Sequence, residues 1–530
     1  MNLYHMFSLI NIIILILWIM SAFVDYNYFC YILQLKEYRM DRIKDFLSTK
    51  KGKDFWKKYI VLWRPIFVII IFLSPIDDLM ILKYTIITIF SLEFIINILQ
   101  LKRGKLKHPV FTKKAILIIF SAILVEALLF FASGAWIGLL LLMSIRLLII
   151  SLVVSIFYIP TAYIKKIIIK KAKLKLSKYK NLKVIGITGS YGKSSVKNFL
   201  STIIGKKYRV IKTPKNINTE IGIAKFILDN DFANADVFVV EMGAYKIGEI
   251  ELICDMVEPT IGVLTAITEQ HLALFGGIKM TQQAKYELLR SLPENGLAVV
   301  NSDNKYCREF LHELKCKKVT FGVEEEFNPD FLIKEFDNTA QGINFFGKMY
   351  NKDISVSAPV IGTHNAKNIV PCYLVADFLG ISIEEAKSQT NKLVLPDNTL
   401  SIINYGEAII LDDTYNSNYN GFCAGLDVLS GYSNKKRIVV TRGIPELGAM
   451  STEVHTKIGS EIAYIADELI ILDKDNAEAL IDGVGEKFHT SIKIVNDPNE
   501  LLEIIKSYKN TPSVILLENR VPDILIKEVK

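Results

Sequence analysis

A lysine that follows two closely spaced glycines is the first feature of this chain that could do chemistry. It lies in Val184–Ser195, VIGITGSYGKSS, where a short apolar run leads into a glycine-containing turn and then into Gly-Lys-Ser-Ser. Such a turn lets backbone N–H groups close around a phosphate, and the start of a following helix adds a favourable dipole. There Lys193 would contact the β- and γ-phosphates of a nucleotide, and the Ser194 hydroxyl would hold Mg²⁺. The residues predicted to bind the nucleotide are Gly189, Ser190, Gly192, Lys193, Ser194 and Ser195.

The spacing departs from the strict phosphate-binding loop in one place. That motif has a second glycine five residues before Gly192, and this chain has Ile187 there. A turn that contains Gly-Lys-Ser by chance is therefore the alternative interpretation, and the surrounding elements must decide between the two.

Elements of alternating type surround this loop. Val184–Ile187 reads as a strand, and Ser194–Ile204 reads as a helix with apolar residues at helical spacing. Such alternation predicts an α/β domain with a mainly parallel sheet and a site at the carboxyl ends of the strands. The further predicted strands are Val237–Val240, Ile261–Leu264 and Leu297–Val300, and the further predicted helices are Glu220–Leu228 and Thr281–Leu292.

Two side chains that follow these strands could hold a metal ion. Glu241 ends a short apolar run, and a carboxylate at a strand end beside a phosphate loop can ligate Mg²⁺. His271, one of seven histidines, comes a few residues after the strand Ile261–Leu264. A single histidine is more often structural than a ligand, so its role depends on the motifs around it.

A series of further motifs accompanies the loop, and each is modest on its own. In chain order they are GITGSYGKSS, TPKNINTEIG (Thr213–Gly222), EMGAYKIGEI (Glu241–Ile250), the step His271-Leu272, AKYELL (Ala284–Leu289), NSDN (Asn301–Asn304), GTHNAKN (Gly362–Asn368), LDDTYNSN (Leu411–Asn418) and IPELG (Ile444–Gly448). This order resembles that of the Mur ligases, and most closely that of their D-alanyl-D-alanine-adding members, from Val184 to the C-terminus. The Mur ligases spell their phosphate loop T-G-x-x-G-K-S, so the departure at Ile187 agrees with the resemblance.

The resemblance implies an ATP-dependent amide ligase of cell-envelope precursor synthesis. Mur ligases use ATP to turn a substrate carboxylate into an acyl phosphate, and an amine then attacks it, so that phosphate leaves as the amide forms. By this match Lys193 contacts the phosphates, while Ser194 and Glu241 hold a first Mg²⁺. His271 would hold a second Mg²⁺ between the γ-phosphate and the substrate carboxylate, two anions that otherwise repel each other.

Further site residues follow from the resemblance alone. Lys285 matches the family lysine that CO₂ carbamylates, because a carbamate offers the anionic oxygen that an ammonium lacks; an ordinary lysine on a helix surface is the alternative. Asn365 and Asn368 match the pair that faces adenine, and Asp413 matches the residue that contacts the ribose. Turn capping is the alternative for each asparagine. The residues that match substrate-binding positions are Asn216, Asn218, Thr219, Tyr415, Asn416 and Glu446.

The C-terminal segment reads as a second, smaller α/β domain of Rossmann-like pattern, without a G-x-G-x-x-G motif. In the family this domain brings the incoming amine and closes over ATP, which excludes water from the acyl phosphate. Glu446 to Gly448 and His455 match a family segment on the amine side. The predicted strands are Ala408–Leu411, Ile438–Thr441, Glu468–Leu472, Ile492–Val495 and Ser513–Leu517, and the predicted helices include Thr452–Ala463 and Pro498–Ser507.

The first third of the chain is the most apolar part of a sequence that is 51% hydrophobic. Basic loops, such as Lys36–Lys58 and Lys165–Lys180, alternate with loops that are acidic or uncharged. The positive-inside rule then places the N-terminus outside and everything after Tyr158 in the cytoplasm. The five apolar runs predicted to span a membrane are Phe7–Val24, Tyr59–Leu73, Met80–Leu99, Ala115–Phe131 and Trp136–Tyr158.

These patterns predict four regions. They are a transmembrane region of about five helices (1–160), a basic juxtamembrane linker on the inner membrane surface (161–182), a central ATP-binding domain (183–395) and a C-terminal domain (396–530). Glu93, Glu126 and Arg146 fall inside the predicted spans, where charges are costly and often functional. We hypothesise that the helices grip a lipid-linked substrate; the alternative is that these charges pair between helices.

Charge and cysteine usage narrow the partners. The net charge is +8, and the basic residues cluster beside the apolar runs, which indicates a membrane surface rather than nucleic acid as the partner. The six cysteines are scattered and form no C-x-x-C pair. This pattern is typical of reduced thiols in the cytoplasm.

Three features depart from the family pattern. Asn398 stands where the family has an arginine that reaches the γ-phosphate, so another cation such as Arg442 replaces it or turnover is slow. The family usually has an acidic residue near Thr441 and Arg442, before the ELG step, and this chain reads TRGIPELG there, which leaves the identity of the amine open. The predicted spans stand in place of the soluble domain that grips a uridine nucleotide in the D-alanyl-D-alanine-adding members.

We therefore expect a membrane-anchored ligase that uses ATP and two Mg²⁺ ions, with its catalytic domains in the cytoplasm. The first expectation is D-alanyl-D-alanine addition to UDP-N-acetylmuramoyl tripeptide in peptidoglycan synthesis, alongside other cell-wall enzymes. A lipid-linked or other envelope acceptor comes second, and synthesis of poly-amino-acid or folyl polyglutamate chains comes third. A membrane scaffold that only binds ATP is the alternative from another class.

Overall fold

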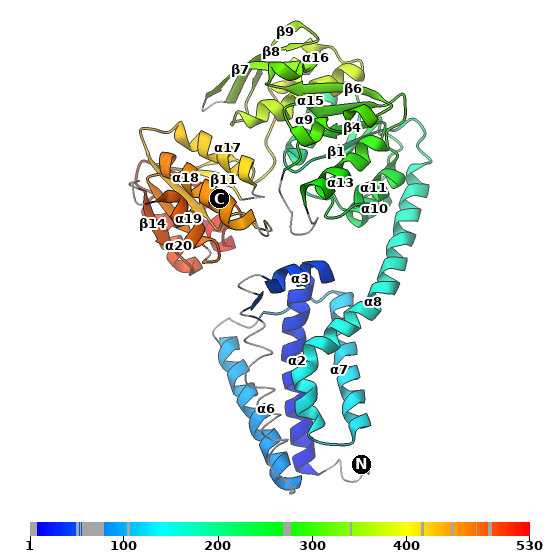
Figure 1. Ribbon diagram of the computed structural model, residues 1–530, viewed down its shortest axis with the longest axis vertical. Coiled ribbons are helices and arrows are strands. Elements are labelled where there is room, and N and C mark those ends of the chain that lie inside the picture. The colour runs from blue at the N-terminus through cyan, green and yellow to red at the C-terminus, as the bar shows by residue number, and fades with distance from the viewer. Residues whose placement is uncertain are drawn as a thin grey trace. The chain divides into compact units, whose positions relative to one another are not determined.

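The computed structural model of the chain describes residues 8–48, 52–53, 55, 79–102, 107–268, 277–339, 342–414, 418–445, 447, 450–472, 474–485 and 490–530. The chain divides into two compact units, Met1–Lys166 and Ile167–Lys530 (Figure 1). The described part of the first unit is mainly helical. The second holds two sheets with helices packed on them, which agrees with the α/β class that the alternating pattern predicts.

The long helices of the first unit follow the apolar runs, and the short α3 (Met40–Ser48) lies in the basic loop Lys36–Lys58. The long helices are α2 (Leu9–Leu35), α6 (Leu79–Lys102), α7 (Lys113–Ser133) and α8 (Gly138–Leu176). Within the described residues, α2, α6, α7 and α8 are the four helices whose length and composition would let them cross a membrane. The predicted run Tyr59–Leu73 lies outside the described residues.

Two helices continue past the ends of their apolar runs. The run that begins α2 predicts an end at Val24, yet the helix continues to Leu35 because the polar residues Asp25 and Asn27 are buried inside the unit. The segment 161–182, predicted to be a linker, is helical as far as Leu176, since α8 passes through Pro160 without ending. Apolar run length therefore underestimates both helices.

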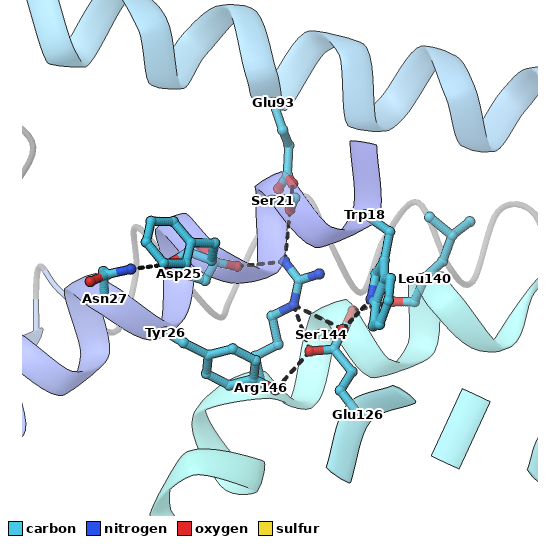
Figure 2. Close-up of polar contacts among 11 residues, drawn as sticks. Trp18, Ser21, Asp25, Tyr26, Asn27, Glu93, Glu126, Leu140, Ser144 and Arg146 are labelled. Atoms are coloured by element: carbon cyan, nitrogen blue, oxygen red, sulfur yellow. Dashed lines mark hydrogen bonds and ion pairs between the residues drawn. The ribbon is translucent and has the colours of Figure 1, made fainter. Parts of the chain in front are cut away.

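Arg146, on α8, lies at the centre of a polar cluster between helices (Figure 2). Its Nε donates to the two carboxylate oxygens of Glu126 on α7, at 3.1 and 3.2 Å. Its Nη1 donates to Asp25 Oδ2 at 2.9 Å and to Ser21 Oγ at 2.7 Å, both on α2. The side chains of Arg146 and Glu126 are fully buried, so the structure shows the alternative for these two charges, in which they pair between helices.

Two aromatic side chains and a third carboxylate complete this cluster (Figure 2). Trp18 Nε1 and the Tyr26 hydroxyl each donate to a Glu126 oxygen at 2.7 Å. The Ser21 hydroxyl donates to Glu93 Oε2 on α6 at 2.5 Å. Hydrogen bonds that cross from one helix to another in this way fix the rotation of each helix about its axis.

The central domain is built on a nine-stranded sheet in the order β2-β3-β1-β4-β5-β6-β7-β8-β9, and its strands β1 to β7 run parallel. The parallel strands are β1 (Lys183–Thr188), β2 (Val210–Lys212), β3 (Val237–Glu241), β4 (Ile261–Leu264), β5 (Leu297–Asn301), β6 (Lys317–Gly322) and β7 (Phe331–Thr339). The predicted strands of this domain all fall inside observed ones.

Helices cover both faces of this sheet (Figure 1). Successive residues of β3 point to opposite faces, so Val239 packs with α9 and α15 while Phe238 and Val240 pack with α10, α11 and α13. Strands that are buried on both faces read as continuous apolar runs. The helices are α9 (Lys193–Ile204), α10 (Glu220–Asp229), α11 (Glu249–Val257), α13 (Ile278–Arg290), α14 (Lys305–Arg308), α15 (His364–Phe378) and α16 (Ile383–Thr390), with short 3₁₀ turns at Leu311–Glu313 and Glu325–Phe327.

An antiparallel extension widens the central sheet beyond the elements that the sequence patterns predict. β8 (Gly342–Met349) pairs antiparallel with β7 and with β9 (Lys352–Ala358). Alternate residues such as Phe345 and Val356 join the same core as α15. This extension enlarges the platform behind α15, the helix that carries the predicted adenine pair.

The C-terminal domain has a six-stranded sheet in the order β10-β11-β15-β12-β13-β14, parallel except for β10. Asp413 and Glu518 stand side by side at the carboxyl ends of β11 and β15. The strands are β10 (Ser401–Tyr405), β11 (Ala408–Asp413), β12 (Lys436–Thr441), β13 (Glu468–Ile471), β14 (Ser491–Ile494) and β15 (Ser513–Glu518), and the helices are α17 (Tyr419–Ser430), α18 (Ser451–Ile465), α19 (Ala477–Val484), α20 (Pro498–Ser507) and α21 (Asp523–Val529).

Candidate nucleotide and metal site

The loop between β1 and α9 has the backbone of a phosphate cradle. Gly192 has φ +79°, and a Cβ there would overlap Oδ1 of Asn368. Gly189 has φ +150°, and a Cβ there would overlap Oγ1 of Thr265. Because neighbouring side chains lie against both positions, only glycine fits there, and the backbone turns directly into the start of α9.

Lys193, the first residue of α9, is folded onto this loop. Its Nζ donates to the carbonyl oxygens of Gly189 at 2.7 Å and Ser190 at 3.3 Å. Burial lowers the pKa of Lys193, and the carboxylate of Glu241 opposes that shift. An ammonium held this way on the loop can exchange its carbonyl partners for phosphate oxygens without moving far.

Glu241, at the carboxyl end of β3, gathers the polar groups of the predicted metal side. Its Oε2 accepts from Ser194 Oγ at 2.8 Å and from Lys197 Nζ at 2.9 Å, and its Oε1 accepts from Asn218 Nδ2 at 3.0 Å. Burial acts to raise the pKa of Glu241, but the Lys197 and Lys193 ammoniums outweigh it and the pKa lies below its ordinary value. The carboxylate is therefore ionised and ready to bind a cation.

Lys197 was missed by the motif spacing although it lies one helical turn after Lys193. Its side chain is buried, and besides Glu241 it contacts the carbonyl oxygen of Lys215 in the segment that leads to Asn218. The available signal was its place on the apolar-periodic face of α9, where a buried lysine needs a buried anion.

Lys285 comes to the same loop from α13. Its Nζ donates to the Gly189 carbonyl at 3.0 Å, and the side chain is buried. Burial, and next the nearby Lys193 ammonium, lower the pKa of Lys285 well below its usual value. The structure thus places this lysine, predicted to be carbamylated, in the site and favours its neutral amine.

The predicted adenine pair is ordered at the start of α15. Asn368 Nδ2 donates to Asn365 Oδ1 at 2.9 Å, and Asn365 Nδ2 donates to the Ile361 carbonyl at 2.7 Å. His364, beside them in the same GTHNAKN motif, was not predicted as a site residue. Its Nδ1 is buried with no hydrogen-bond partner among the described residues, and burial lowers its pKa to about 4.

Both α/β domains contribute to one pocket. Asp413, from the C-terminal domain, accepts from the Leu400 amide at 3.2 Å, and burial raises its pKa to about 7. The pocket is lined by Ser190, Tyr191, Gly192, Lys193, Ser194, Ser195, Asn218, Glu241, His364, Asn368, Thr399, Leu400, Asp413, Asn418 and Gly421. Most of the residues predicted for the nucleotide and the first metal ion therefore meet here.

Other predicted site residues lie elsewhere or outside the description. Thr219 caps α10, because its side chain accepts from the Gly222 amide at 3.3 Å, and Asn216 is exposed and does not line the pocket. The predicted site residues outside the described residues are His271, Tyr415, Asn416 and Glu446.

The histidine matched to the amine side is a structural residue. His455 is fully buried, and its Nε2 accepts from the Ile444 amide at 2.9 Å. Its Nδ1 lies 2.6 Å from the Ser451 carbonyl, so Nδ1 carries the proton and the ring is neutral. His455 thus fixes the backbone at Ile444, the first residue of the IPELG motif.

Asn398, which stands where the family has an arginine, contacts a lysine from the end of the C-terminal domain. Asn398 has φ +58°, and its Oδ1 accepts from Lys530 Nζ, which also lies 3.1 Å from Asp412 Oδ2. Arg442, the cation proposed from the sequence, is not among the residues that line the pocket. Lys530 is thus the cation that the structure brings to Asn398.

The residues present fit a magnesium ion as the bound metal. A hydroxyl and an ionised carboxylate, Ser194 and Glu241, lie 2.8 Å apart beside the phosphate cradle, and Mg²⁺ takes such oxygens together with substrate phosphates. Among the described residues, no group of three or more His, Cys, Asp and Glu side chains gathers for a metal ion. Ser194 and Glu241 would give Mg²⁺ two protein ligands, completed by phosphate oxygens.

The site combines a phosphate-binding loop with a carboxylate that can hold Mg²⁺, and a second α/β domain borders it on one side. This combination is typical of nucleotide-binding proteins of the ATP-dependent ligase type. The family model for the Mur ligase middle domain matches residues 187–376, and the model for the Mur ligase, glutamate ligase domain, matches residues 400–518. The two matches together cover more than half of the sequence. The chain belongs to the Mur ligase family.

Two curated relatives of this chain carry the same enzyme name. The chain is 30% identical over 312 residues to the UDP-N-acetylmuramoyl-tripeptide–D-alanyl-D-alanine ligase of Synechocystis sp., covering 57% of this chain and 65% of that one. It is 29% identical over 316 residues to the ligase of that name from Escherichia coli, covering 58% and 68%. A crystal structure of MurF from Acinetobacter baumannii superposes with TM-score 0.61 at 25% identity, covering 69% and 80%. The chain thus spans about two thirds of the length of the Synechocystis and Escherichia coli relatives, 65% and 68%.

Proposed function

We propose that this chain is an ATP- and Mg²⁺-dependent amide ligase that adds D-alanyl-D-alanine to UDP-N-acetylmuramoyl tripeptide. The relatives that carry this name support the substrate pair. The observation that carries the reaction type is the junction of Lys193, Ser194 and Glu241 with Asp413 on one pocket. Such a pocket can hold a nucleotide between two domains and present its γ-phosphate beside a cation.

The side chains of the cradle divide the work of phosphoryl transfer. Bound at Ser194 and Glu241, Mg²⁺ would supply positive charge that offsets the repulsion between the γ-phosphate and a substrate carboxylate. Lys193 Nζ would leave the Gly189 and Ser190 carbonyls for phosphate oxygens, and the amides of the loop would hold the transferred group. The carboxylate oxygen attacks the γ-phosphorus and ADP leaves, which produces the acyl phosphate.

The second half of the reaction needs an amine and the exclusion of water. The amine nitrogen attacks the acyl carbon, its proton passes to solvent or a base, and phosphate departs as the amide forms. Asp413 and Leu400 border the pocket from the C-terminal domain, so this domain can shield the acyl phosphate from hydrolysis.

Lys285 would take part as a carbamate. Its neutral amine attacks CO₂, the new N–C bond forms, and one proton leaves to solvent, so that an anionic oxygen replaces a basic nitrogen. The buried position of the amine beside Gly189 and its lowered pKa support this reaction. His271, which follows β4 in the sequence, would hold a second Mg²⁺ with that carbamate.

The helical unit would anchor the ligase in a membrane, with the catalytic domains in the cytoplasm where ATP is available. Apolar side chains are exposed on the outer faces of its helices, whereas Asp25, Glu93, Glu126 and Arg146 are buried inside. This distribution is the reverse of that in a water-soluble bundle. Examples of the exposed apolar residues are Leu92, Ile95, Ile116, Phe120, Leu148 and Leu152.

The same helical unit favours a second candidate, in which the acceptor is a lipid-linked envelope precursor. A catalytic unit that follows directly from a long apolar helix, α8, would meet substrates at the membrane surface. Pairing of Glu126 with Arg146 explains these two charges without a substrate, so they lend this candidate no support.

Release of ADP and phosphate by the full chain in detergent tests both candidates. UDP-linked and lipid-linked tripeptide acceptors are each supplied with and without D-alanyl-D-alanine, with other amines in parallel. The proposal expects release only when the UDP-linked acid and the dipeptide are both present, and none from a Lys193→Ala variant. ATP that is bound but never consumed, under every combination, would instead identify a scaffold.

A further inference from the structure

A pocket of about 420 Å³ opens at one end of the helical unit, away from the Arg146 cluster. The first turns of α2 and α6 line it together with the connection 134–137 that leads into α8. Leu82 and Ile137 give it apolar walls, and Asn11, Lys83 and Trp136 give it polar and aromatic groups. Neither the nucleotide site nor the family matches involve these residues, since the matches begin at residue 187.

Lys83 is the residue of this pocket that indicates a bound ligand. It is only 9% exposed although it is a lysine. Its Nζ lies 5.3 Å from the ring centroid of Trp136, and within the part of the chain that the structure describes it forms no ion pair or hydrogen bond. A cation–π contact offsets little of the cost of removing an ammonium from water. An anion bound in the pocket would supply the missing charge.

The backbone around the pocket favours an anion as well. α2 begins at Leu9, α6 at Leu79 and α8 at Gly138, so the pocket lies beside the starts of three helices, and Gly134, the C-cap of α7, lines it as well. Each helix N-terminus carries partial positive charge, although the first amides of α8 already donate to the turn before it, Gly138 to the Ala135 carbonyl at 3.0 Å and Leu139 to the Trp136 carbonyl at 3.1 Å. Three such termini and one buried ammonium converge on one space.

The surroundings restrict the kind of anion. Met80, Ile81 and Tyr84 of α6 do not line the pocket, and their apolar side chains are exposed beside it. Trp136 is a tryptophan, a residue type that is enriched at membrane–water interfaces. We propose that this pocket binds the phosphate headgroup of an anionic lipid, with Lys83 as its cation and the neighbouring apolar faces against its acyl chains. This proposal rests on the membrane position of the helical unit given above.

The predicted topology puts this end of the helices at the outer leaflet, because the N-terminus of α2 lies there. The ligand is then a structural lipid and not the substrate of the ATP-dependent reaction. Lipid binding and ligase turnover can therefore fail independently, and each has its own assay.

Native mass spectrometry of the full chain in neutral detergent tests the proposal. Short-chain phosphatidylglycerol is titrated beside phosphatidylcholine of equal chain length and beside sodium phosphate. The expected result is saturable binding of phosphatidylglycerol that Lys83→Gln weakens about tenfold or more, because a charge-assisted contact is lost. Lys83→Arg keeps the charge and should bind within about threefold of the parent chain. Lys102→Gln, at the exposed far end of α6, is the matched control and should bind unchanged.

Three outcomes would overturn the proposal. Equal binding of phosphatidylglycerol by the parent and Lys83→Gln chains removes Lys83 from the site. Equal binding of phosphatidylcholine, or of phosphate alone, removes the anionic lipid as the ligand. The third outcome concerns Asp77 and Asp78, which precede α6 in the sequence: if they neutralise Lys83, the lipid-free Lys83→Gln chain unfolds at a lower temperature than the parent, whereas the proposal expects an equal or higher one.

Discussion

Removal of the Arg146 guanidinium is the perturbation whose cost the structure defines best. Arg146 and Glu126 are both fully buried, and Arg146 also holds Asp25 at 2.9 Å. An Arg146→Met substitution keeps most of the side-chain volume but leaves two buried carboxylates without their cation. Breaking a buried pair in this way costs about 3–5 kcal/mol of unfolding free energy.

The partner substitutions separate the pair from the rest of the cluster. Glu126→Gln leaves Arg146 with Asp25, so it should cost only about 1–3 kcal/mol. The double variant removes both charges of the main pair, and its cost should fall short of the summed single costs by about 2 kcal/mol. Leu148→Ala, on the exposed face of the same helix, is the control and should lie within about 0.5 kcal/mol of the parent chain.

Thermal unfolding of the full chain in detergent, followed by tryptophan fluorescence, measures these costs. Trp18 donates to Glu126 and so reports on the cluster itself. For a unit of this size 1 kcal/mol shifts Tm by about 2–4 °C, so Arg146→Met should lower it by about 6–20 °C. Strictly additive single and double effects, or an Arg146→Met transition at the parent temperature, would refute the reasoning.

Other residues give shorter tests. Gly192→Ala should abolish ATP binding in a filter assay, because a Cβ overlaps Asn368 and φ is +79°; intact binding would contradict the cradle. Lys197→Met should destabilise the metal-free chain by about 3 kcal/mol, and Mg²⁺ should raise its Tm more than that of the parent. Purging CO₂ should lower kcat reversibly, and more so at low pH, because carbamylation of Lys285 needs the neutral amine that its lowered pKa provides; a rate indifferent to bicarbonate would exclude the carbamate. In the folded chain the pKa of His364 is lowered from 6.5 to about 4. As pH falls, His364 is therefore protonated in the unfolded chain before it is protonated in the folded chain. The free energy of unfolding should then be full above pH 6.5 and fall by about 3 kcal/mol toward pH 4. A His364→Asn chain should lack that slope.

Sequence patterns located those strands of the second unit that are buried along their whole length, such as β3, β4 and β5. β4 has the predicted bounds Ile261–Leu264, since a continuous apolar run with turns on both sides has no other stable place in an α/β domain. α20 also has its predicted bounds, Pro498–Ser507. Asp497 caps it and proline fills its first position, both of which are local signals.

The same patterns missed the antiparallel strands after β6 and the continuation of α2 and α8. β8 alternates buried and exposed residues only because α15 covers one of its faces. The continuation of α2 depends on Asp25, whose partner Arg146 lies 121 residues further along the chain. No local window contains both members of that pair.

The sequence by itself determined the chemistry of this protein: the glycines of the cradle, Lys193, Ser194 and Glu241 are spaced as strand, loop and helix require, and these requirements are local. Tertiary structure alone decided which charges meet. Lys197 pairs with Glu241 across 44 residues, Lys285 reaches Gly189 across 96, and Lys83 enters a pocket made by three helix ends. A buried lysine side chain needs a hydrogen-bond or anionic partner, whereas an exposed one does not. Which lysines are buried depends on how the whole chain packs.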